Sequence, residues 1–554
     1  MSAGWGFAVG WGKYHGLDTG FGAIYFESLL WQTMNAPMMR VGWIATVGLA
    51  IGRAMAAEPS APSEWIDPAT GHVMVRLSKE PGTASLYFHN NGYTPDGKKL
   101  VIVTPEGLAT VNLQTRAIDL VVPGFKLPMS KSSGIEVSRK ENVVYYNTRV
   151  NGQNVINATN LDTHATRQVV VLPFGGDFGG LNSDDTFLVG DYTAGGGGGG
   201  RRGRGAGTAA GNVTTGNTTV GNITTNGVSS AAPVNLTASG MPAGNVTAGN
   251  STAEAVAGGN ATAVATGGRR GNGRGGRGNG GGGQTKEFFT VNIKTGEIKT
   301  FFPSPDNLNH VQSSPTDPNL FLYAHEGNWA QVDRIWTMHY DGSGNKLMHA
   351  RSMPNEIAGH EFFSHDGKWV YYDLQTPESV QFWIGGVNVA SGERVRYPLE
   401  RAEWSVHYNV SWDGKEFLGD GGGPNSVASR QPGVGLLDPP QNGQWMYLFT
   451  PEAGKYETIK VNGEDVKVGK LDVEKLADLS KHDYGNGEAS RVEPNGTFTP
   501  DDKWIVFRSN MEGTLGVYEV EVAKATPEET KRIAGEWAAY KAANAGAAPT
   551  PGGG

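Results

Sequence analysis

The chain of 554 residues contains no cysteine, which excludes disulfide bonds and thiolate metal sites. A Gly-x-Ser-x-Gly elbow is also absent, and no α/β pattern follows the strand-rich part, so a serine hydrolase domain is disfavoured. The net charge is only −8, and this modest acidity argues against a nucleic-acid partner for the folded part.

No apolar run near the start is long enough for a stable membrane-spanning helix. The sequence Met38-Met39-Arg40 is followed by an apolar stretch and by Ala-x-Ala at Ala54–Ala56, the order typical of a secretory signal peptide. We therefore predict a biological start at Met38 or Met39, with residues 1–57 forming an upstream extension plus signal peptide. The expected location is periplasmic or secreted, without a stable membrane anchor. A cytoplasmic location is the alternative, because Arg53 interrupts the apolar run.

What the chain has in abundance is a repeated polar turn of the Ser/Thr-x-Asp-Gly-Lys kind that leads into a short apolar strand. The clearest copies are TPDGKKLVIV (94–103), SHDGKWVYYD (364–373), SWDGKEFLGD (411–420) and TPDDKWIVFR (499–508). Three weaker copies bring the total to seven, and a second strand pair follows each copy. One small sheet cannot bury its own faces, so this repeat predicts an all-β, seven-bladed β-propeller over residues 58–525. We expect residues 72–80 to pair with the last blade and close the ring.

Two further segments differ in composition from the repeats. Residues 195–283 are mainly Gly, Asn, Thr, Ala and Arg, and they are predicted to form a disordered insertion because they lack apolar material. The Arg-Gly clusters in this insertion resemble RNA-binding tails, but a tolerated loop expansion is the simpler interpretation. Residues 526–554 are expected to form a short C-terminal helix and a flexible tail.

Histidine is scarce, with 12 in the chain, yet four histidines flank predicted strands of neighbouring repeats. They are His310, His325, His360 and His407, and Arg334 lies among them. A single histidine before a strand is usually a structural hydrogen-bonding group. Several that face one axial funnel are what metal binding or proton transfer requires.

At these residues the sequence resembles the oligogalacturonate lyases of polysaccharide lyase family 22. The resemblance is carried by HVQSSPTDPNLFLYAHEGNW (310–329), DRIW (333–336), AGHEFFSHDGKWVYYDLQTP (358–377) and EWSVHYNVSWDGKEFLGDGGG (403–423). It implies a seven-bladed propeller that cleaves oligogalacturonides, which are pectin fragments, by metal-assisted β-elimination to 4,5-unsaturated uronates. The implied cofactor is a divalent metal, typically Mn²⁺.

The resemblance also implies roles for individual residues. His360 matches the proposed catalytic base and Arg334 the charge-stabilising arginine. His310, Gln312 and His325 are expected to bind substrate. Loss of the C5 proton of a uronate places negative charge on the adjacent carboxylate, which a cation neutralises while a neutral histidine accepts the proton.

The implied metal ligands are His407, Glu493 and Asn495. The family has a Gln-x-x-His-x-His run before the last repeat, and here Glu493 and Asn495 occupy the two histidine positions. Oxygen ligands suit Mn²⁺, Mg²⁺ or Ca²⁺. The alternative is that Glu493 pairs with an arginine such as Arg491 or Arg508 and that no metal binds.

Two carboxylates next to these histidines receive separate predictions. Glu361 follows His360 and, in a regular strand, would point to the opposite face, which predicts a structural role. Glu326 either is structural or orients a neighbouring histidine.

Two other functions stay open. A non-catalytic periplasmic propeller that binds or scaffolds is one alternative, because a fold does not set a function. A lyase acting on another uronate-containing glycan is the second. The residues gathered in the funnel favour an enzyme, a carbon-oxygen lyase that we expect to act as a monomer on an oligogalacturonide substrate.

Overall fold

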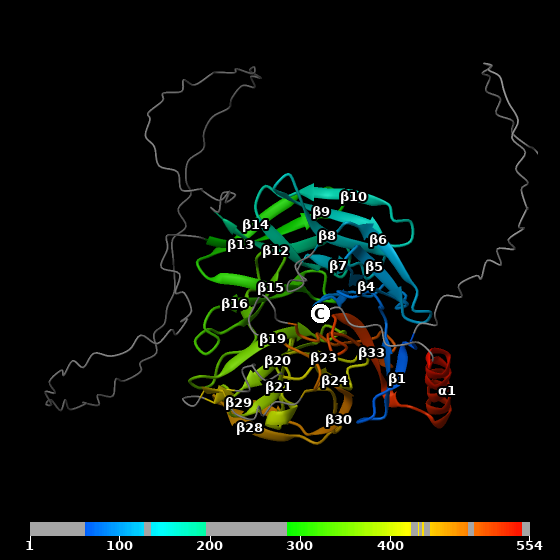
Figure 1. Ribbon diagram of the computed structural model, residues 1–554. Coiled ribbons are helices and arrows are strands. Elements are labelled where there is room, and N and C mark those ends of the chain that lie inside the picture. The colour runs from blue at the N-terminus through cyan, green and yellow to red at the C-terminus, as the bar shows by residue number, and fades with distance from the viewer. Residues whose placement is uncertain are drawn as a thin grey trace, which may run out of the picture. The chain divides into compact units, whose positions relative to one another are not determined.

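Most of the strands form a ring of mainly antiparallel sheets, which Figure 1 shows arranged around a common centre. The computed structural model describes residues 61–126, 134–194, 285–422, 430–431, 435–436, 444–485 and 492–545. The described residues all fall within the unit Ser60–Gly554. The predicted signal peptide and the predicted insertion at 195–283 lie outside the described residues.

The first three blades are built from consecutive strands. Blade 1 contains β3 (Ala84–Ser85), β4 (Lys99–Val103), β5 (Gly107–Asn112) and β6 (Ile118–Pro123). Blade 2 contains β7 (Ile135–Val137), β8 (Val143–Val150), β9 (Gln153–Asn160) and β10 (Thr166–Val171). Blade 3 contains β11 (Gly176–Leu181), β12 (Phe187–Ala194), β13 (Thr285–Asn292) and β14 (Ile298–Ser304), so the predicted insertion falls between its second and third strands.

Blades 4 to 6 follow the same order, and blade 5 has two further strands at its outer edge. Blade 4 contains β15 (Asn307–Ser313), β16 (Leu320–Glu326), β17 (Ile335–His339) and β18 (Lys346–Leu347). Blade 5 contains β19 (Ile357–Phe363), β20 (Trp369–Gln375), β21 (Phe382–Asn388) and β22 (Arg394–Leu399), extended by the hairpin of β28 (Glu457–Val461) and β29 (Glu464–Val468). Blade 6 contains β23 (Tyr408–Val410), β24 (Phe417–Gly419), β27 (Trp445–Pro451) and β30 (Leu471–Asp478). The 3-10 helix Arg401–Glu403 precedes β23, and β25 (Arg430–Gln431) pairs with β26 (Gly435–Leu436).

The last blade joins the two ends of the propeller. Its strands β31 (Thr497–Phe498), β32 (Trp504–Ser509) and β33 (Gly516–Lys524) are completed by β2 (His72–Arg76) and β1 (Glu64–Ile66). Strand β2 pairs antiparallel with β33, with Met74 opposite Val520. The predicted seven-bladed propeller is confirmed, and residues 72–76 close the ring as expected.

The repeated polar turn links the first and second strands of a blade. In the first copy the Thr94 hydroxyl donates to Asp96 Oδ1 at 2.7 Å, and the Gly97 amide donates to the Thr94 carbonyl at 2.8 Å. Gly97 has φ 68°, a left-handed conformation that glycine adopts without steric cost. In the last copy Asp502 takes this position with φ 57°, and its carboxylate accepts a hydrogen bond from the Trp412 amide of the neighbouring blade at 2.7 Å. The turn therefore also ties adjacent blades together.

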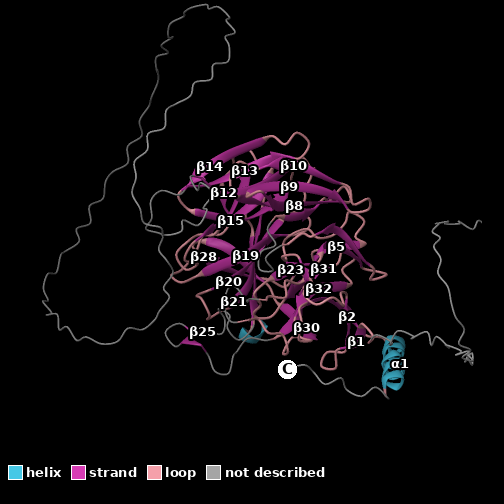
Figure 2. Ribbon diagram, turned by 45° about the horizontal axis from the view of Figure 1, so that its top comes forward, coloured by secondary structure: helices cyan, strands magenta, loops and turns pink. Residues whose placement is uncertain are grey.

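The predicted C-terminal helix is α1 (Pro527–Asn544), the one long helix among the described residues in Figure 2. Thr526 caps it by accepting a hydrogen bond from the Glu529 amide. The helix packs on β1, where Ile533 is buried and the Trp537 indole donates to the Glu64 carbonyl at 2.7 Å. Nowhere in the described part of the chain does a helix have the length and apolar character needed to cross a membrane.

Candidate functional site

Two histidines occupy equivalent positions in neighbouring blades. His310 lies in β15 and His360 in β19, the first strands of blades 4 and 5, and both have φ 49°. The pairings of these strands shift register at the same points, so each histidine lies in a β-bulge. Asn495, just before the first strand of blade 7, has φ 51°. Such conformations cost about 1–3 kcal/mol each and are typical of positions that aim a functional side chain.

Glu326 connects Arg334 with His310. Arg334 Nη1 and Nη2 donate to the two carboxylate oxygens of Glu326 at 2.8 and 2.9 Å, and the guanidinium lies 4.1 Å from the centre of the Trp329 ring. Glu326 Oε1 is 3.4 Å from His310 Nε2. The Arg334 side chain is only 1% exposed, whereas that of His310 is 30% exposed. The carboxylate therefore fixes a buried cation and a histidine that solvent or a ligand can reach.

The charges of Glu326, His310 and Arg334 shift one another's pKa values. Burial would raise the pKa of Glu326, but His310 and Arg334 hold that pKa well below its usual range. Burial would lower the pKa of His310, yet the hydrogen bond to Glu326 and the nearby charge of Glu361 raise it above its usual value. The neighbouring carboxylates therefore shift His310 toward the imidazolium form.

Glu361 is the most unusual of the buried carboxylates. It is 1% exposed, and neither of its carboxylate oxygens has a hydrogen-bond partner among the described residues. Its charge raises the pKa values of both His310 and Arg334, against the lowering effect of burial. The bulge at His360 interrupts the regular alternation on which the prediction of a purely structural role was based.

His407 forms the second group of the site. Its Nδ1 is 2.8 Å from Asp420 Oδ2, and its backbone amide donates to Asp420 Oδ1 at 2.9 Å. The buried carboxylate of Asp420 therefore fixes the orientation of the His407 ring and directs Nε2 away from Asp420. Nε2 is 3.2 Å from the Tyr87 hydroxyl and 3.6 Å from Glu493 Oε2.

His360 lies between these two groups. Its ring centre is 5.1 Å from that of Trp329, which stacks on Arg334, and 4.8 Å from that of His407. The structure therefore brings together three of the predicted residues: His360, Arg334 and His407.

The other predicted substrate-binding residues have different surroundings. His325 Nδ1 is 3.4 Å from Asp306 Oδ2, and its ring packs against Trp336 with centres 5.0 Å apart. Among the described residues, neither His360 nor His407 contacts His325. Gln312 is buried and its side-chain amide donates to the Glu361 carbonyl at 2.6 Å. Of the three predicted substrate-binding residues, His310 thus has the clearest access to the site.

The predicted metal ligands fit a divalent cation in part. His407 Nε2 and Glu493 Oε2 converge, but the side chain of Asn495 is used elsewhere: its Oδ1 accepts from the Phe88 amide at 3.4 Å and its Nδ2 donates to the Glu493 carbonyl at 3.0 Å. Within the described ranges no cluster of three or more His, Cys, Asp or Glu side chains is arranged to hold a metal. Residues 486–491, which include Arg491, lie outside them.

Arg508 is one of the two arginines that could pair with Glu493 in the alternative without a metal. Its Nε donates to the backbone carbonyl of Glu493 at 2.8 Å, and the Glu493 charge counteracts the lowering of the Arg508 pKa by burial. Arg508 thus holds the backbone at Glu493 through this hydrogen bond.

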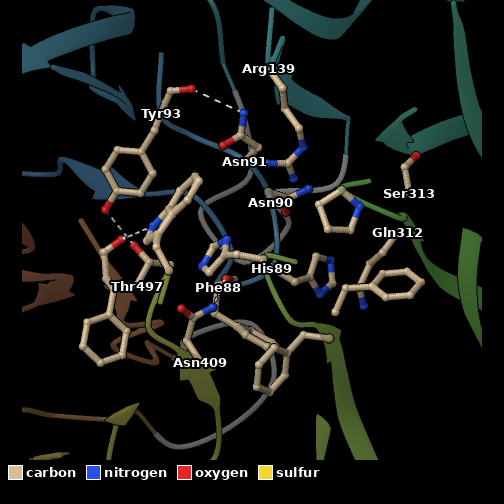
Figure 3. A pocket seen from close by; sticks show the side chains of 16 residues that line it. Phe88, His89, Asn90, Asn91, Tyr93, Arg139, Gln312, Ser313, Asn409 and Thr497 are labelled. Carbon is tan, nitrogen blue, oxygen red and sulfur yellow. Dashed lines mark hydrogen bonds between the residues drawn. The ribbon is translucent and has the colours of Figure 1, made fainter. Parts of the chain in front are cut away.

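Sequence reasoning missed Tyr87, His89 and Asp420. His89 packs against Tyr87 with ring centres 4.8 Å apart, and it borders a cavity that Gln312 and Asn409 also line (Figure 3). Burial, together with the positive charges of neighbouring histidines, lowers the pKa of His89 well below its usual value. One signal was available: His310, His360, His407 and Asn495 each stand four residues before the Ser or Thr of a repeated turn, and Asn90, next to His89, does so in blade 1.

Comparison with known proteins identifies relatives. Residues 284–526 match a family model described as oligogalacturonate lyase. The chain is 26% identical over 233 residues to the oligogalacturonate lyase of Dickeya dadantii. It is 24% identical over 237 residues to the oligogalacturonide lyase of Pectobacterium atrosepticum. Each match covers 42% of this chain and 54% of the relative, so the chain spans about half the length of the curated relatives it matches.

Solved structures match over a larger part of the chain. An oligogalacturonate lyase in complex with manganese has a TM-score of 0.54 at 18% identity, covering 84% of this chain and 99% of that one. The oligogalacturonate lyase of Vibrio parahaemolyticus has the same TM-score and identity, covering 83% and 96%. At this identity the structural matches establish the propeller fold. The resemblance seen in the sequence agrees with the family match: residues 284–526 are similar to oligogalacturonate lyases.

Proposed function

We propose that the protein is a lyase that cleaves oligogalacturonides by β-elimination and leaves a 4,5-unsaturated uronate. The observation that carries this proposal is the convergence of His360, Arg334 and His407 in one site. The family match over residues 284–526 supports it, because these three residues lie within the matched segment. The same chemistry on another uronate-containing glycan would use the same residues.

His360 is assigned as the general base. Its bulge gives the imidazole a position between the two groups of the site, and the residue is only partly buried. A neutral imidazole there accepts the C5 proton of the uronate, a contribution of about 10²–10⁴ in rate.

Arg334 is assigned to stabilise the charge that develops on the uronate carboxylate. One well-placed donor typically contributes about 2.7–4 kcal/mol to such a transition state. Both Nη atoms of Arg334 already bind Glu326. We therefore infer that Arg334 acts on the substrate through its fixed positive charge rather than through a new two-point hydrogen bond.

A divalent cation, Mn²⁺ first with Mg²⁺ or Ca²⁺ as alternatives, would be held by Nε2 of His407 and the carboxylate of Glu493. When bound, such an ion neutralises the uronate carboxylate. Asn495 would support both ligands. Its backbone amide donates to Asp420, which contacts His407, and its side-chain Nδ2 donates to the Glu493 carbonyl. The structurally similar lyase in complex with manganese supports Mn²⁺ as the first candidate ion.

Substrate contacts are assigned to His310, Gln312 and His325. His310 reaches the site directly, Gln312 supports it through Glu361, and His325 would contact a more distant sugar. Export to the periplasm stays a prediction from the sequence.

Incubation with di- and trigalacturonate tests the function. The unsaturated product absorbs ultraviolet light, so absorbance should rise with the wild-type protein supplied with Mn²⁺. His339→Gln is a matched control, because His339 lies at the end of β17 and contacts Ser343. Absence of any rise with Mn²⁺, Mg²⁺ or Ca²⁺ would contradict the proposal and favour a binding propeller or another uronate substrate.

A further inference from the structure

Elimination from a galacturonide requires a proton donor as well as a base. The C4–O4 bond breaks with its electron pair on oxygen, and this oxygen needs a proton to leave easily. In the galacto configuration the C5–H and C4–O4 bonds point to opposite faces of the ring. The donor must therefore be a different group from the base, His360.

We propose that His310 is the general acid that protonates the leaving oxygen, an inference that rests on the proposed lyase function. His360 takes the C5 proton, and the C5–H electron pair becomes the second bond between C4 and C5. The C4–O4 bond then breaks with its pair on O4, and His310 Nδ1 gives its proton to O4. His310 afterwards regains a proton from solvent and His360 releases one, so that no net proton is consumed.

The geometry that carries the inference is the equivalence of the two histidines. His310 and His360 lie in β-bulges of neighbouring first strands with the same φ of 49°. Tyr87 links them, because its ring centre is 6.3 Å from that of His310 and its hydroxyl is 3.2 Å from Nε2 of His407, whose ring lies 4.8 Å from that of His360. Glu326 contacts His310 through Nε2 at 3.4 Å, which leaves Nδ1 for the substrate. The 30% exposure of the His310 side chain gives a ligand access to it.

The charges around His310 come from four directions. Glu326 of β16 and Glu361 of β19 are the carboxylates that favour its protonated form, and Arg334 opposes them. The charge of His310 also acts to lower the pKa of Asp191 in β12, and Lys286 pairs with this carboxylate at 2.7 Å. The remaining neighbours, on the blade 1 side, are the rings of Tyr87 and His89, with centres 6.3 and 6.2 Å away.

Glu361 is a buried carboxylate whose charge acts on His310. A buried carboxylate without hydrogen bonds is costly, and such exceptions call for an explanation. The described residues give its oxygens no hydrogen-bond partner, yet its charge acts on His310. We assign Glu361 as a positioning residue that keeps His310 protonated without touching the substrate.

Two substrates with different leaving groups test the role of His310. On trigalacturonate, His310→Gln should lower kcat by about 10²–10⁴. On a galacturonide whose O4 carries a 2,4-dinitrophenyl group, which leaves without protonation, the same variant should stay within about tenfold of wild type, since acid catalysis contributes little there. His360→Ala should lose activity on both substrates.

The outcomes separate the two proposals. Equal losses of His310→Gln on both substrates, or no loss on trigalacturonate, would overturn the acid role. A wild-type protein inactive on both substrates would instead overturn the lyase function. Near-normal thermal unfolding of His310→Gln shows that a kinetic loss does not come from misfolding.

The pH profile gives an independent readout. A general acid must be protonated, so the rate falls as pH rises through the pKa of His310. Removing the negative charge in Glu361→Gln lowers that pKa, and the descending limb should move to lower pH. An unchanged descending limb in a folded Glu361→Gln variant would overturn the assignment of Glu361.

Discussion

The two halves of the site hold their histidines in opposite electrostatic settings. On the blade 4 side, Glu326 binds Arg334 and His310 together, so one carboxylate is shared by two groups that carry positive charge. On the blade 6 side, Asp420 and Glu493 flank the single histidine His407. The first setting favours an imidazolium and a fixed positive charge. The second places the two ring nitrogens of one histidine against two carboxylates, with Nδ1 at Asp420 and Nε2 toward Glu493. His360 lies between the two halves, and the proposed mechanism assigns it the role of base.

Removing the central residue should have the largest effect on this arrangement. His360→Ala should lower kcat by about 10²–10⁴, the usual contribution of a general base, and leave the unfolding transition nearly unchanged. Initial rates of ultraviolet absorbance measure the loss, with His339→Gln as the control. A variant with near-normal turnover would remove His360 from the role of base.

Glu326→Gln should remove the ion pairs of Glu326 with Arg334 and His310 on the blade 4 side. The glutamine keeps the shape but not the charge, so the free energy of unfolding should fall by about 1.5–3 kcal/mol, the range for hydrogen bonds to charged groups. Chemical denaturation measures this difference. The matched variant Glu297→Gln changes an exposed carboxylate, and it should have little effect. Equal stabilities of both variants would show that Glu326 does not hold the group together.

The same substitution should change the dependence of stability on pH. Glu326 has a depressed pKa, so its contribution is present above about pH 4.3, the usual value for an unfolded chain, and is lost as pH falls toward the folded value. His310 has a raised pKa, so its contribution is present below about pH 6.5 and is lost as pH rises through the folded value. Glu326→Gln should flatten the acid limb of wild-type stability. An acid limb identical to that of wild type would contradict the ion pair.

Asp420→Asn should weaken metal binding at His407, on the blade 6 side of the site. The amide no longer stabilises the Nδ1–H form of His407, so Mn²⁺ affinity should fall by about 10- to 100-fold, as for other outer-shell partners of metal-bound histidine. Calorimetric titration of the purified protein with Mn²⁺ measures the affinity directly. Unchanged binding, or no Mn²⁺ binding by the wild type, would refute the metal site at His407.

The smallest effect is expected at His325, which packs against Trp336 and not against the central histidine. His325→Gln should raise KM for trigalacturonate by no more than about tenfold and leave kcat unchanged, the signature of a lost ground-state contact. A large decrease in kcat with unchanged KM would move His325 into the catalytic group.

The propeller could be predicted because its signal is local and repeated. The Thr94–Gly97 turn carries its own hydrogen bonds within four residues, and related turns recur along the chain. Ring closure by β2 was predictable because a strand without a partner at one end must pair with the last blade. The helix α1 carried its own capping signal at Thr526.

The site was predictable only where a histidine or arginine stands close to such a repeat. Tyr87 meets His407 across 320 positions of sequence, and no local pattern reports that contact. The role of Glu361 was hidden because the bulge at His360 breaks the alternation of the strand. Asp420 ends a copy of the repeat, and its pairing with His407 becomes visible only in three dimensions.

The most direct test of the central claim is the mass of the products formed from trigalacturonate. β-Elimination at His360 predicts fragments in which one partner lacks the elements of water relative to the hydrolysis product, together with a new vinyl proton signal in the NMR spectrum. These products should be absent from His360→Ala. Saturated fragments of hydrolytic mass, or intact trigalacturonate after incubation with the Mn²⁺-supplied wild-type protein, would contradict the account.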